Sequence, residues 1–356
     1  MTKLRGALSQ IQGRFETAER SPFDDGWAAE EPAGETFRTE VTEERARSII
    51  ARNDSPDIPF EQSINPYRGC EHGCIYCYAR PSHAYLELSP GLDFETRLFA
   101  KTNAVELLKE EIAAKGYRVR PIAFGTNTDC YQPIERRYEV MRGVLEELAA
   151  CDHPLTIVTK SALIERDIDL LAPMARKNLV KAFVSITTLE HRLARTLEPR
   201  AASPQRRVHT LRALAGAGIP CGVMVAPLIP ALTDRSLEGV LEAAANAGAT
   251  MAGWILLRLP NEVRPLFREW LAAHHPQRAG HVISIIRQSR GGRENDPNFG
   301  SRMTGSGNFV ELIGRRFDLA CRRLGLNSED NHMASRSGLD CSLFRPPQRA
   351  GQLRLF

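Results

Sequence analysis

Three closely spaced cysteines constrain this chain more than any other feature of its sequence. Cys70, Cys74 and Cys77 have three and then two residues between them, and the next cysteine along the chain is Cys130. A structural zinc ion usually takes four protein ligands, often from paired Cys-x2-Cys knuckles. Three thiolates can instead hold a cubane iron–sulfur cluster and leave one iron free to bind another molecule. The spacing therefore favours a catalytic cluster.

The composition indicates a folded cytoplasmic protein. The 356 residues suffice for one large α/β domain with extensions or for two small domains, and 42% of them are hydrophobic. The first ten residues lack the apolar stretch of a signal peptide, and no apolar run approaches the length of a membrane span. Eight cysteines in a reducing compartment indicate metal and core positions rather than disulfides.

The patterns of polar and apolar residues divide the chain into four expected segments. The first is polar and acidic in patches, which favours a flexible extension with at most a short helix at 43–51. The last is rich in Arg, Ser and Pro, which favours an extended tail. The expected segments are a flexible extension (1–58), a barrel (59–288), a loop with a capping helix (289–327) and an extended tail (328–356).

Short apolar runs alternate with amphipathic stretches through the second segment, as in repeated βα units around a parallel sheet. Six such units predict a partial (β/α)6 barrel of the TIM type, in the α/β class. The expected strands are 63–67, 122–125, 155–159, 180–186, 221–226 and 251–257, and the expected helices are 102–115, 134–150, 163–175, 204–217, 236–247 and 262–273.

Polar or conformationally special residues follow five successive strands of this expected barrel. They are the cysteine loop and the segments 125–129, 159–160, 185–188 and 227–230. Ordinary βα loops also favour such residues as turns and caps, so each segment alone is a weak signal. Because parallel barrels gather their active sites at the carboxyl ends of the strands, the series as a whole predicts an active site there.

The cysteine motif resembles that of the radical S-adenosylmethionine (radical SAM) enzymes, Cys-x3-Cys-x-aromatic-Cys, with Tyr76 in the aromatic position. The segment from His72 to Tyr78 is similar to the spore photoproduct lyase branch, whose relatives are often labelled DNA repair photolyases, and the likeness extends over about residues 60–290. It implies a [4Fe-4S] cluster held by the three cysteines, bound SAM, a 5′-deoxyadenosyl radical that abstracts hydrogen, and an external one-electron donor of the flavodoxin or ferredoxin type.

The same resemblance assigns roles to residues beyond the cysteines. It implies that Lys160 binds the SAM carboxylate and that Ser185 contacts SAM. Thr187 lies on the same strand face as Ser185, because side chains alternate along a strand. Tyr76 would pack against the cluster and the adenine, and both Tyr76 and Tyr78 are candidates for returning a hydrogen atom. A surface lysine, a core hydroxyl and packing tyrosines are the simpler interpretations of these side chains.

One position departs from the lyase. Where the lyase has a hydrogen-donating cysteine after the second strand, this chain has Thr126, which we count among the cofactor contacts. Cys130 is an alternative donor or a structural thiol. Glu198 and Arg200 follow the fourth strand and could meet SAM or substrate, or form a surface ion pair. The departure favours hydrogen abstraction from a substrate other than the spore lesion.

The carboxyl-terminal part suggests partners. Residues 261–356 contain 15 Arg, no Lys and 9 acidic residues, a bias that suits nucleic acid as well as an ordinary solvated surface. The final Gln352, Leu353, Leu355 and Phe356 resemble the peptide by which bacterial proteins bind the DNA sliding clamp. DNA is therefore the first substrate class to test.

Two alternatives remain open from the sequence. One is a non-catalytic nucleic-acid-binding or clamp-associated protein with a structural zinc ion and His72 as fourth ligand. The other is a radical SAM enzyme that acts on a peptide or a small metabolite.

Overall fold

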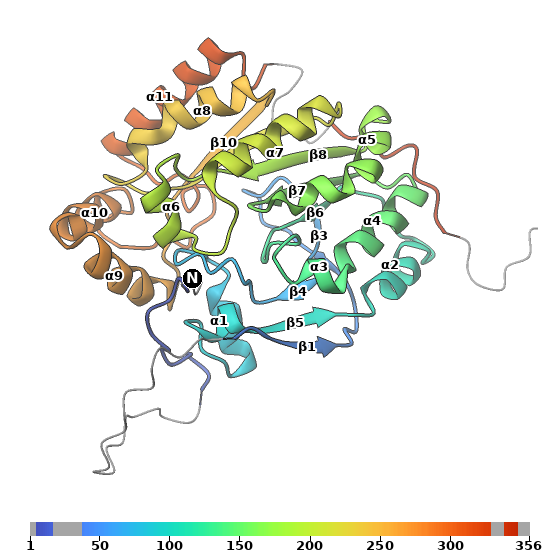
Figure 1. Ribbon diagram of the computed structural model, residues 1–356, viewed down its shortest axis with the longest axis horizontal. Helices are drawn as coiled ribbons and strands as arrows, with labels where there is room; N and C mark the ends of the chain where they lie inside the picture. Colours follow the sequence, from blue (N-terminus) through green and yellow to red (C-terminus); the bar gives the residue numbers. More distant parts are fainter. Residues whose placement is uncertain (1–4, 17–37, 329–337, 348–356) are drawn as a thin grey trace, which may run out of the picture.

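Six strands of the main sheet run parallel and follow one another in chain order (Figure 1). In this computed structural model the described residues are 5–16, 38–328 and 338–347. Each parallel strand overlaps a strand expected from the sequence, which confirms the partial barrel. Across the sheet the order is β10 (Met251–Leu256), β9 (Cys221–Leu228), β8 (Val180–Ser185), β7 (Leu155–Thr159), β6 (Ile122–Phe124), β3 (Gln62–Ile64) and the antiparallel edge strand β2 (Ile50–Arg52).

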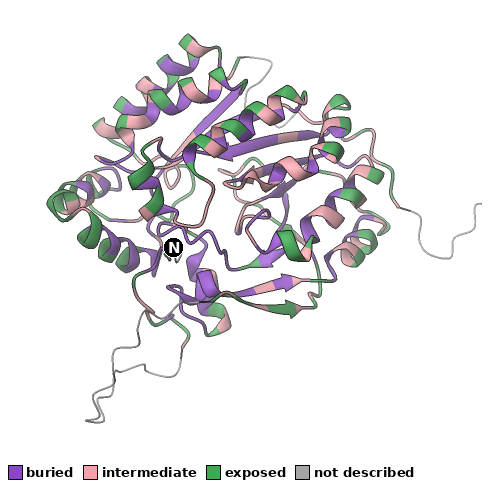
Figure 2. Ribbon diagram, viewed as in Figure 1, coloured by how far each residue is buried: buried purple, intermediate pink, exposed green. Residues whose placement is uncertain are grey.

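Helices cover the outside of this sheet, so the strands are buried on both faces, as Figure 2 shows. In β8, for example, five of the six residues are buried. A local signal marks the start of α7, which begins after Ser203, whose hydroxyl accepts the Arg206 N–H, and has Pro204 in its first turn. The helices between the strands are α2 (Ala104–Ile112), α3 (Glu135–Tyr138), α4 (Val140–Ala150), α5 (Ile168–Arg176), α6 (His191–Leu197), α7 (Pro204–Gly216) and α8 (Leu237–Asn246), with short 3₁₀ helices η2 (Ala162–Asp167) and η3 (Asp234–Ser236).

The expected helix at 43–51 is wrong, because two strands occupy that region. β1 (Glu40–Glu44) joins β5 (Arg97–Lys101) and β4 (Tyr67–Arg68) in a small second sheet, and β2 pairs with β3. The Glu111 carboxylate accepts the N–H groups of Ile49 and Ile50, at 2.6 and 3.1 Å. Pairing with strands distant in sequence therefore outweighs the local helical pattern.

The described residues of the expected amino-terminal extension pack on the barrel. The N–H groups of Gly6 and Ala7 donate to the buried Glu95 carboxylate, at 2.9 and 2.8 Å. Glu95 belongs to the short helix α1 (Asp93–Thr96), which follows η1 (Arg80–Leu86). Residues 5–16 thus contribute to the core around the cysteine loop, and the expectation of a separate extension is wrong for them.

Three further helices follow the barrel: α9 (Val263–His274), α10 (Pro276–Gln288) and α11 (Asn308–Leu324). The expected capping helix is α11, which packs on α8 and places Phe317 against Trp254 of β10, with ring centres 6.5 Å apart. Helix α9 instead joins the apolar cluster that contains Cys74, Ile75 and Tyr76. The helix that directly follows β10 therefore supports the cysteine loop, and α11 packs beside β10.

The described part of the tail lies at the amino-terminal ends of the strands. The Arg345 N–H donates to the Cys151 carbonyl and the Asp340 N–H to the Asn178 carbonyl, each at 2.9 Å. The clamp-like residues Gln352 to Phe356 lie outside the described residues. None of the described helices is long and apolar enough to cross a membrane.

Candidate active site

The cysteine loop connects β4 to η1 and is fixed by its main chain. The Cys70 N–H donates to the Phe94 carbonyl at 2.9 Å, and the Ile75 N–H donates to the Leu197 carbonyl at 3.1 Å. Gly73 has φ +67°, and a Cβ there would lie 2.6 Å from the Glu95 carboxylate. Cys70 and Cys74 are buried and Cys77 is half-buried, so three thiols converge in a loop of set shape.

A buried ion pair between Arg80 and Glu95 contacts the main chain of the cysteine loop. Arg80 is fully buried and donates to the Glu95 carboxylate at 2.5 Å, to the Cys74 carbonyl at 2.9 Å and to the Gly73 carbonyl at 3.3 Å. Because Glu95 also accepts the N–H groups of the amino-terminal segment, both charges are satisfied by partners of fixed geometry. The pair holds the carbonyls of the cysteine loop in place.

The other side of the loop is tied to β6 and β7. His72 Nδ1 lies 3.4 Å from Asp129 Oδ2, and Asp129 also accepts from the Lys160 N–H and the Thr159 hydroxyl, both at 2.7 Å. Burial acts to raise the pKa of Asp129, but His72 and these hydrogen bonds outweigh it and lower the pKa to about 2. Asp129 thus joins the cysteine loop to the strand end that carries Lys160.

Tyr76 lies close to three other predicted site residues, Lys160, Thr187 and Glu198. Its hydroxyl donates to the Glu198 carboxylate and lies 3.2 Å from the Thr187 hydroxyl, which donates to the same carboxylate at 2.7 Å. The Lys160 ammonium lies 5.8 Å from the centre of the Tyr76 ring. The loops after three different strands therefore bring together Tyr76, Lys160, Thr187 and Glu198.

Glu198 is a buried carboxylate, 4% exposed, and its second partner is Arg207 of α7. Arg207 also donates to the Ser185 carbonyl at 3.0 Å. Burial alone raises the pKa of Glu198, but Arg207 and then Lys160 outweigh burial and lower the pKa to about 2. Glu198 is therefore a fixed negative charge, and the surface ion pair between Glu198 and Arg200 is wrong: Arg200 binds Glu71 instead.

Lys160 is the half-buried cation of this group. Burial lowers the pKa of Lys160, but its attraction to the thiolate form of Cys74 and to the Glu198 carboxylate outweighs burial and leaves the pKa above the ordinary value. In turn, burial raises the pKa of the Cys74 thiol to about 12, although Lys160 opposes part of the rise. The thiolate form that iron binds thus needs the charge of the metal, with Lys160 as its nearby cation.

Tyr78 and Thr126 form a second contact at the rim. The Tyr78 hydroxyl donates to the Thr126 carbonyl, and the Asn65 side-chain oxygen accepts the Asn127 N–H at 3.0 Å. Gly125 makes this turn possible, since its φ is +76° and a Cβ would lie 1.8 Å from the Val158 carbonyl. Tyr78 is 49% exposed, so its ring lies at the open side of the site.

Two predicted residues lie apart from these contacts. Cys130 is fully buried in the main core, where burial and then Asp129 and Glu135 raise the pKa of its thiol. This environment is that of a structural thiol. Ser185 is buried at the end of β8, and its carbonyl receives Arg207.

The three free thiols of the loop fit an iron–sulfur cluster. In a cubane each thiolate binds a different iron, so three cysteine sulfurs stand further apart than the ligands of one ion. His72 faces Asp129, an orientation that gives no support to its role as a fourth zinc ligand.

Sequence reasoning missed the charged residues that organise the site. Arg207 precedes the buried Leu211 and Leu214 by four and seven residues, so all three lie on one face of α7. A charged residue on this apolar face was the sequence signal that could have identified Arg207. Arg80 and Glu95 had no such signal, because their partners come from distant segments.

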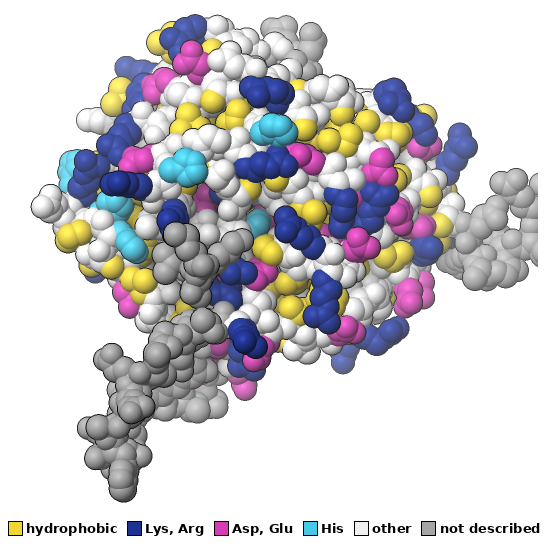
Figure 3. Space-filling view, in the orientation of Figure 1, with side chains coloured by type: hydrophobic (Ala, Val, Ile, Leu, Met, Phe, Trp, Pro, Cys, Tyr) yellow, Lys and Arg dark blue, Asp and Glu magenta, His cyan; other side chains and the backbone are white. Residues whose placement is uncertain are grey.

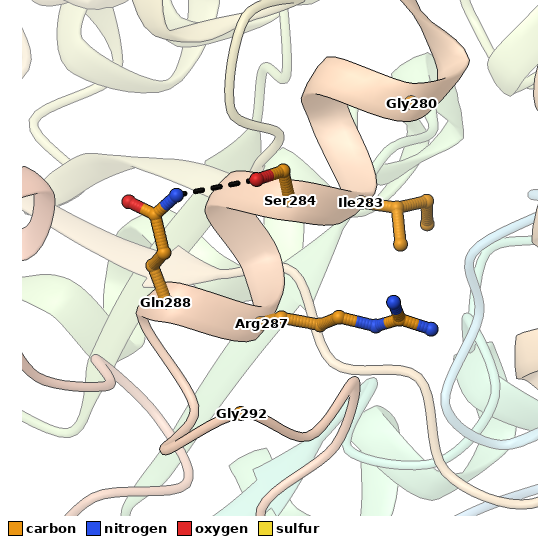
Figure 4. A pocket seen from close by; sticks show the side chains of 6 residues that line it. All are labelled: Gly280, Ile283, Ser284, Arg287, Gln288 and Gly292. Atoms are coloured by element: carbon orange, nitrogen blue, oxygen red, sulfur yellow. Dashed lines mark hydrogen bonds between the residues drawn. The ribbon is translucent and has the colours of Figure 1, made fainter.

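Two cavities lie on the described surface, one along α10 and one beside α6. A groove of about 530 Å³ runs along α10. Figure 4 shows the side chains that line it, among them Gln288, which donates to the Ser284 hydroxyl at 3.2 Å. None of the residues that line it is a predicted site residue. A smaller cavity of about 160 Å³ reaches Glu198 from the side of α6. On the face in Figure 3, basic and acidic side chains are interspersed.

The fold and the site define an α/β-barrel metalloenzyme with a three-thiolate loop after the first parallel strand and a cation and a carboxylate at neighbouring strand ends. Residues 64–244 match the Radical SAM superfamily, a span of about half of the chain. The chain belongs to this superfamily, whose enzymes use a [4Fe-4S] cluster and SAM. This identity overturns the interpretation as a non-catalytic zinc protein.

The chain is also similar to proteins of other organisms and to solved structures. An uncharacterized protein of Mycobacterium tuberculosis is 40% identical over 233 residues, 65% of this chain and 68% of the relative. An uncharacterized protein of Methanocaldococcus jannaschii is 30% identical over 198 residues, 55% and 71% of the two chains. Spore photoproduct lyase complexed with dinucleoside spore photoproduct has a TM-score of 0.57 at 18% identity, over 80% of each chain. That likeness shows a shared fold.

Proposed function

We propose that this protein reductively cleaves SAM at its cluster and uses the 5′-deoxyadenosyl radical to abstract hydrogen from a DNA substrate. The observation that carries the proposal is the contact group around Tyr76, which joins the cysteine loop to Lys160, Thr187 and Glu198. When bound to Cys70, Cys74 and Cys77, the cluster supplies the electron that cleaves SAM.

The residues of the chain bind and orient the two cofactors. Lys160 offers an ammonium to the SAM carboxylate, and Glu198 and Arg207 keep the surrounding charges balanced and in place. The N–H groups and carbonyls of the cysteine loop are already bonded to the protein, so the loop keeps its shape as the cofactors bind. Thr187 follows β8 by two residues and contacts Tyr76 and Glu198, and Ser185 ends β8 with its carbonyl bonded to Arg207.

The exposed Tyr78 is the better candidate for hydrogen return to the substrate. Its ring lies at the open rim, whereas Tyr76 is buried against Glu198. The buried Cys130 has no such access, and its environment supports no catalytic role.

DNA as the substrate class rests on associations. The structurally similar lyase is complexed with a dinucleoside photoproduct, and the carboxyl-terminal residues 261–356 have an excess of arginine. We further propose a flavodoxin- or ferredoxin-type electron donor, a cytoplasmic location that suits eight free cysteines, and sliding-clamp binding by Gln352, Leu353, Leu355 and Phe356.

The test is anaerobic reconstitution with iron and sulfide, reduction with dithionite and chromatography of the SAM products. The wild type is expected to release 5′-deoxyadenosine, and Cys77→Ala to release none. Cys321→Ser is the matched control, because Cys321 lies on the buried face of α11 and packs in the main core. A fully loaded wild-type cluster that yields no 5′-deoxyadenosine would refute the proposal.

A further inference from the structure

Arg258 lies two residues beyond β10 and reaches the open side of the active site. Its guanidinium carbon is 5.7 Å from the centre of the Tyr78 ring, and Tyr78 itself contacts Thr126. The side chain thus extends from the end of the last parallel strand toward the loops that follow the first two. It therefore lies beside the exposed Tyr78 ring at the rim of the candidate site.

The guanidinium of Arg258 lacks an oxygen acceptor among the described residues. Its hydrogen bond there is from Nη1 to the Met303 thioether at 3.7 Å, a weak acceptor, and its buried Nε has no partner. Burial and the nearby Arg302 lower the pKa of Arg258. Burying a guanidinium whose N–H donors have no acceptor costs folding free energy unless an anion accepts their hydrogen bonds.

The neighbouring charges do not supply that anion. Arg302 forms a two-bond ion pair with Asp57, at 2.6 and 2.7 Å, and so uses the nearby carboxylate. Arg290 is buried and donates to main-chain carbonyls, including that of Leu257 at 3.0 Å. The surroundings of Arg258 therefore carry an excess of positive charge.

Aromatic rings accompany two of these guanidinium groups. Tyr78 lies beside Arg258, and Phe299 lies under Arg302 at 4.6 Å, with 49% and 58% of the two residues exposed. Exposed rings beside cationic side chains suit unpaired bases and their phosphates, because bases stack on rings while the cation meets the backbone.

We propose that Arg258 binds a backbone phosphate of a nucleotide-containing substrate, with Tyr78 and Phe299 as faces for its bases. The planar fork of arginine can donate two parallel hydrogen bonds to one phosphate. The inference rests on the proposed function, because it names the substrate group that the radical site would face. Lys160, on another strand end, remains the cation for SAM.

The test compares two dinucleotides by titration calorimetry with the reconstituted, SAM-loaded protein. The probes are thymidylyl-(3′→5′)-thymidine and its uncharged methylphosphonate analogue. The wild type is expected to bind the charged probe about tenfold more tightly, as one charge-assisted contact predicts. Arg258→Gln should lose this preference and Arg258→Lys should keep part of it. Arg235→Gln, which removes an exposed pair with Glu190, should retain it in full.

Reductant is omitted, so binding is read independently of SAM cleavage and the two proposals can fail separately. A wild type that binds neither probe or does not distinguish them would overturn the inference. So would a full preference in Arg258→Gln, or in Arg258→Lys if the glutamine variant does not fold. A tenfold loss of SAM affinity in the same variants would reassign Arg258 to the SAM carboxylate and also overturn it.

Discussion

Replacing Glu198 with Gln tests the electrostatics of the site through protein stability. The pKa of Glu198 falls from an ordinary 4.5 to about 2 in the folded chain because Arg207 and Lys160 outweigh its burial. A difference of that size corresponds to roughly 3 kcal/mol of folding free energy when the carboxylate is ionised. Most of this free energy is the interaction with Arg207, and breaking a buried ion pair typically costs a similar amount, about 3–5 kcal/mol.

The sign of the pH dependence follows from the lowered pKa. Ionised Glu198 stabilises the fold fully above pH 4.5, and this stabilisation is lost as the pH falls toward 2. The Glu198→Gln variant should therefore be about 3 kcal/mol less stable than the wild type at pH 7 and about 1.5 kcal/mol less stable at pH 3.

Urea unfolding of the apoprotein, followed by circular dichroism at several pH values, measures this difference. The matched control is Glu190→Gln, because Glu190 forms an exposed pair with Arg235 and its loss should cost under about 1 kcal/mol. A deficit below about 1 kcal/mol for Glu198→Gln at pH 7, or one that does not change with pH, would refute the reasoning.

Three other substitutions have defined outcomes. Gly125→Ala places a Cβ 1.8 Å from a β7 carbonyl at φ +76° and should cost more than about 2 kcal/mol in thermal unfolding, whereas Gly116→Ala, also at positive φ but in open space, should cost about 1 kcal/mol. Gly6→Ala places a Cβ 1.7 Å from a carbonyl of the cysteine loop, so the cluster absorbance should decay faster in air than in the wild type; an unchanged decay contradicts a covering role. Lys160→Gln should weaken SAM binding about tenfold by calorimetry, while the exposed Lys177→Gln should not; equal affinities in the two variants would remove Lys160 from the SAM site.

The parts of the site that follow local rules were predictable from the sequence. The cysteine spacing and the polar strand ends, such as Thr159 with Lys160, depend on short segments and on the shared edge of a parallel sheet. The convergence of Tyr76 with Thr187 and Glu198 follows from the order of the strands once the barrel is recognised.

The parts that depend on long-range pairing were not predictable. The segment 43–51 has a helical pattern, yet Glu111 and the two sheets determine its conformation. Arg80 and Glu95 are ordinary charged residues in the sequence, and only the fold shows that both are fully buried. Nor does chain order reveal that α9 supports the cysteine loop while α11 packs beside β10.

The contact of Gly6 and Ala7 with Glu95 also has a consequence for the order of folding during synthesis. These residues are translated before their acceptor, which is made almost 90 residues later. The amino-terminal segment can therefore dock only after the cysteine loop and α1 have emerged from the ribosome. Until it docks, the cysteine loop lacks the cover of Gly6 against the Gly73 carbonyl and of Ala7 in the apolar cluster of Cys74.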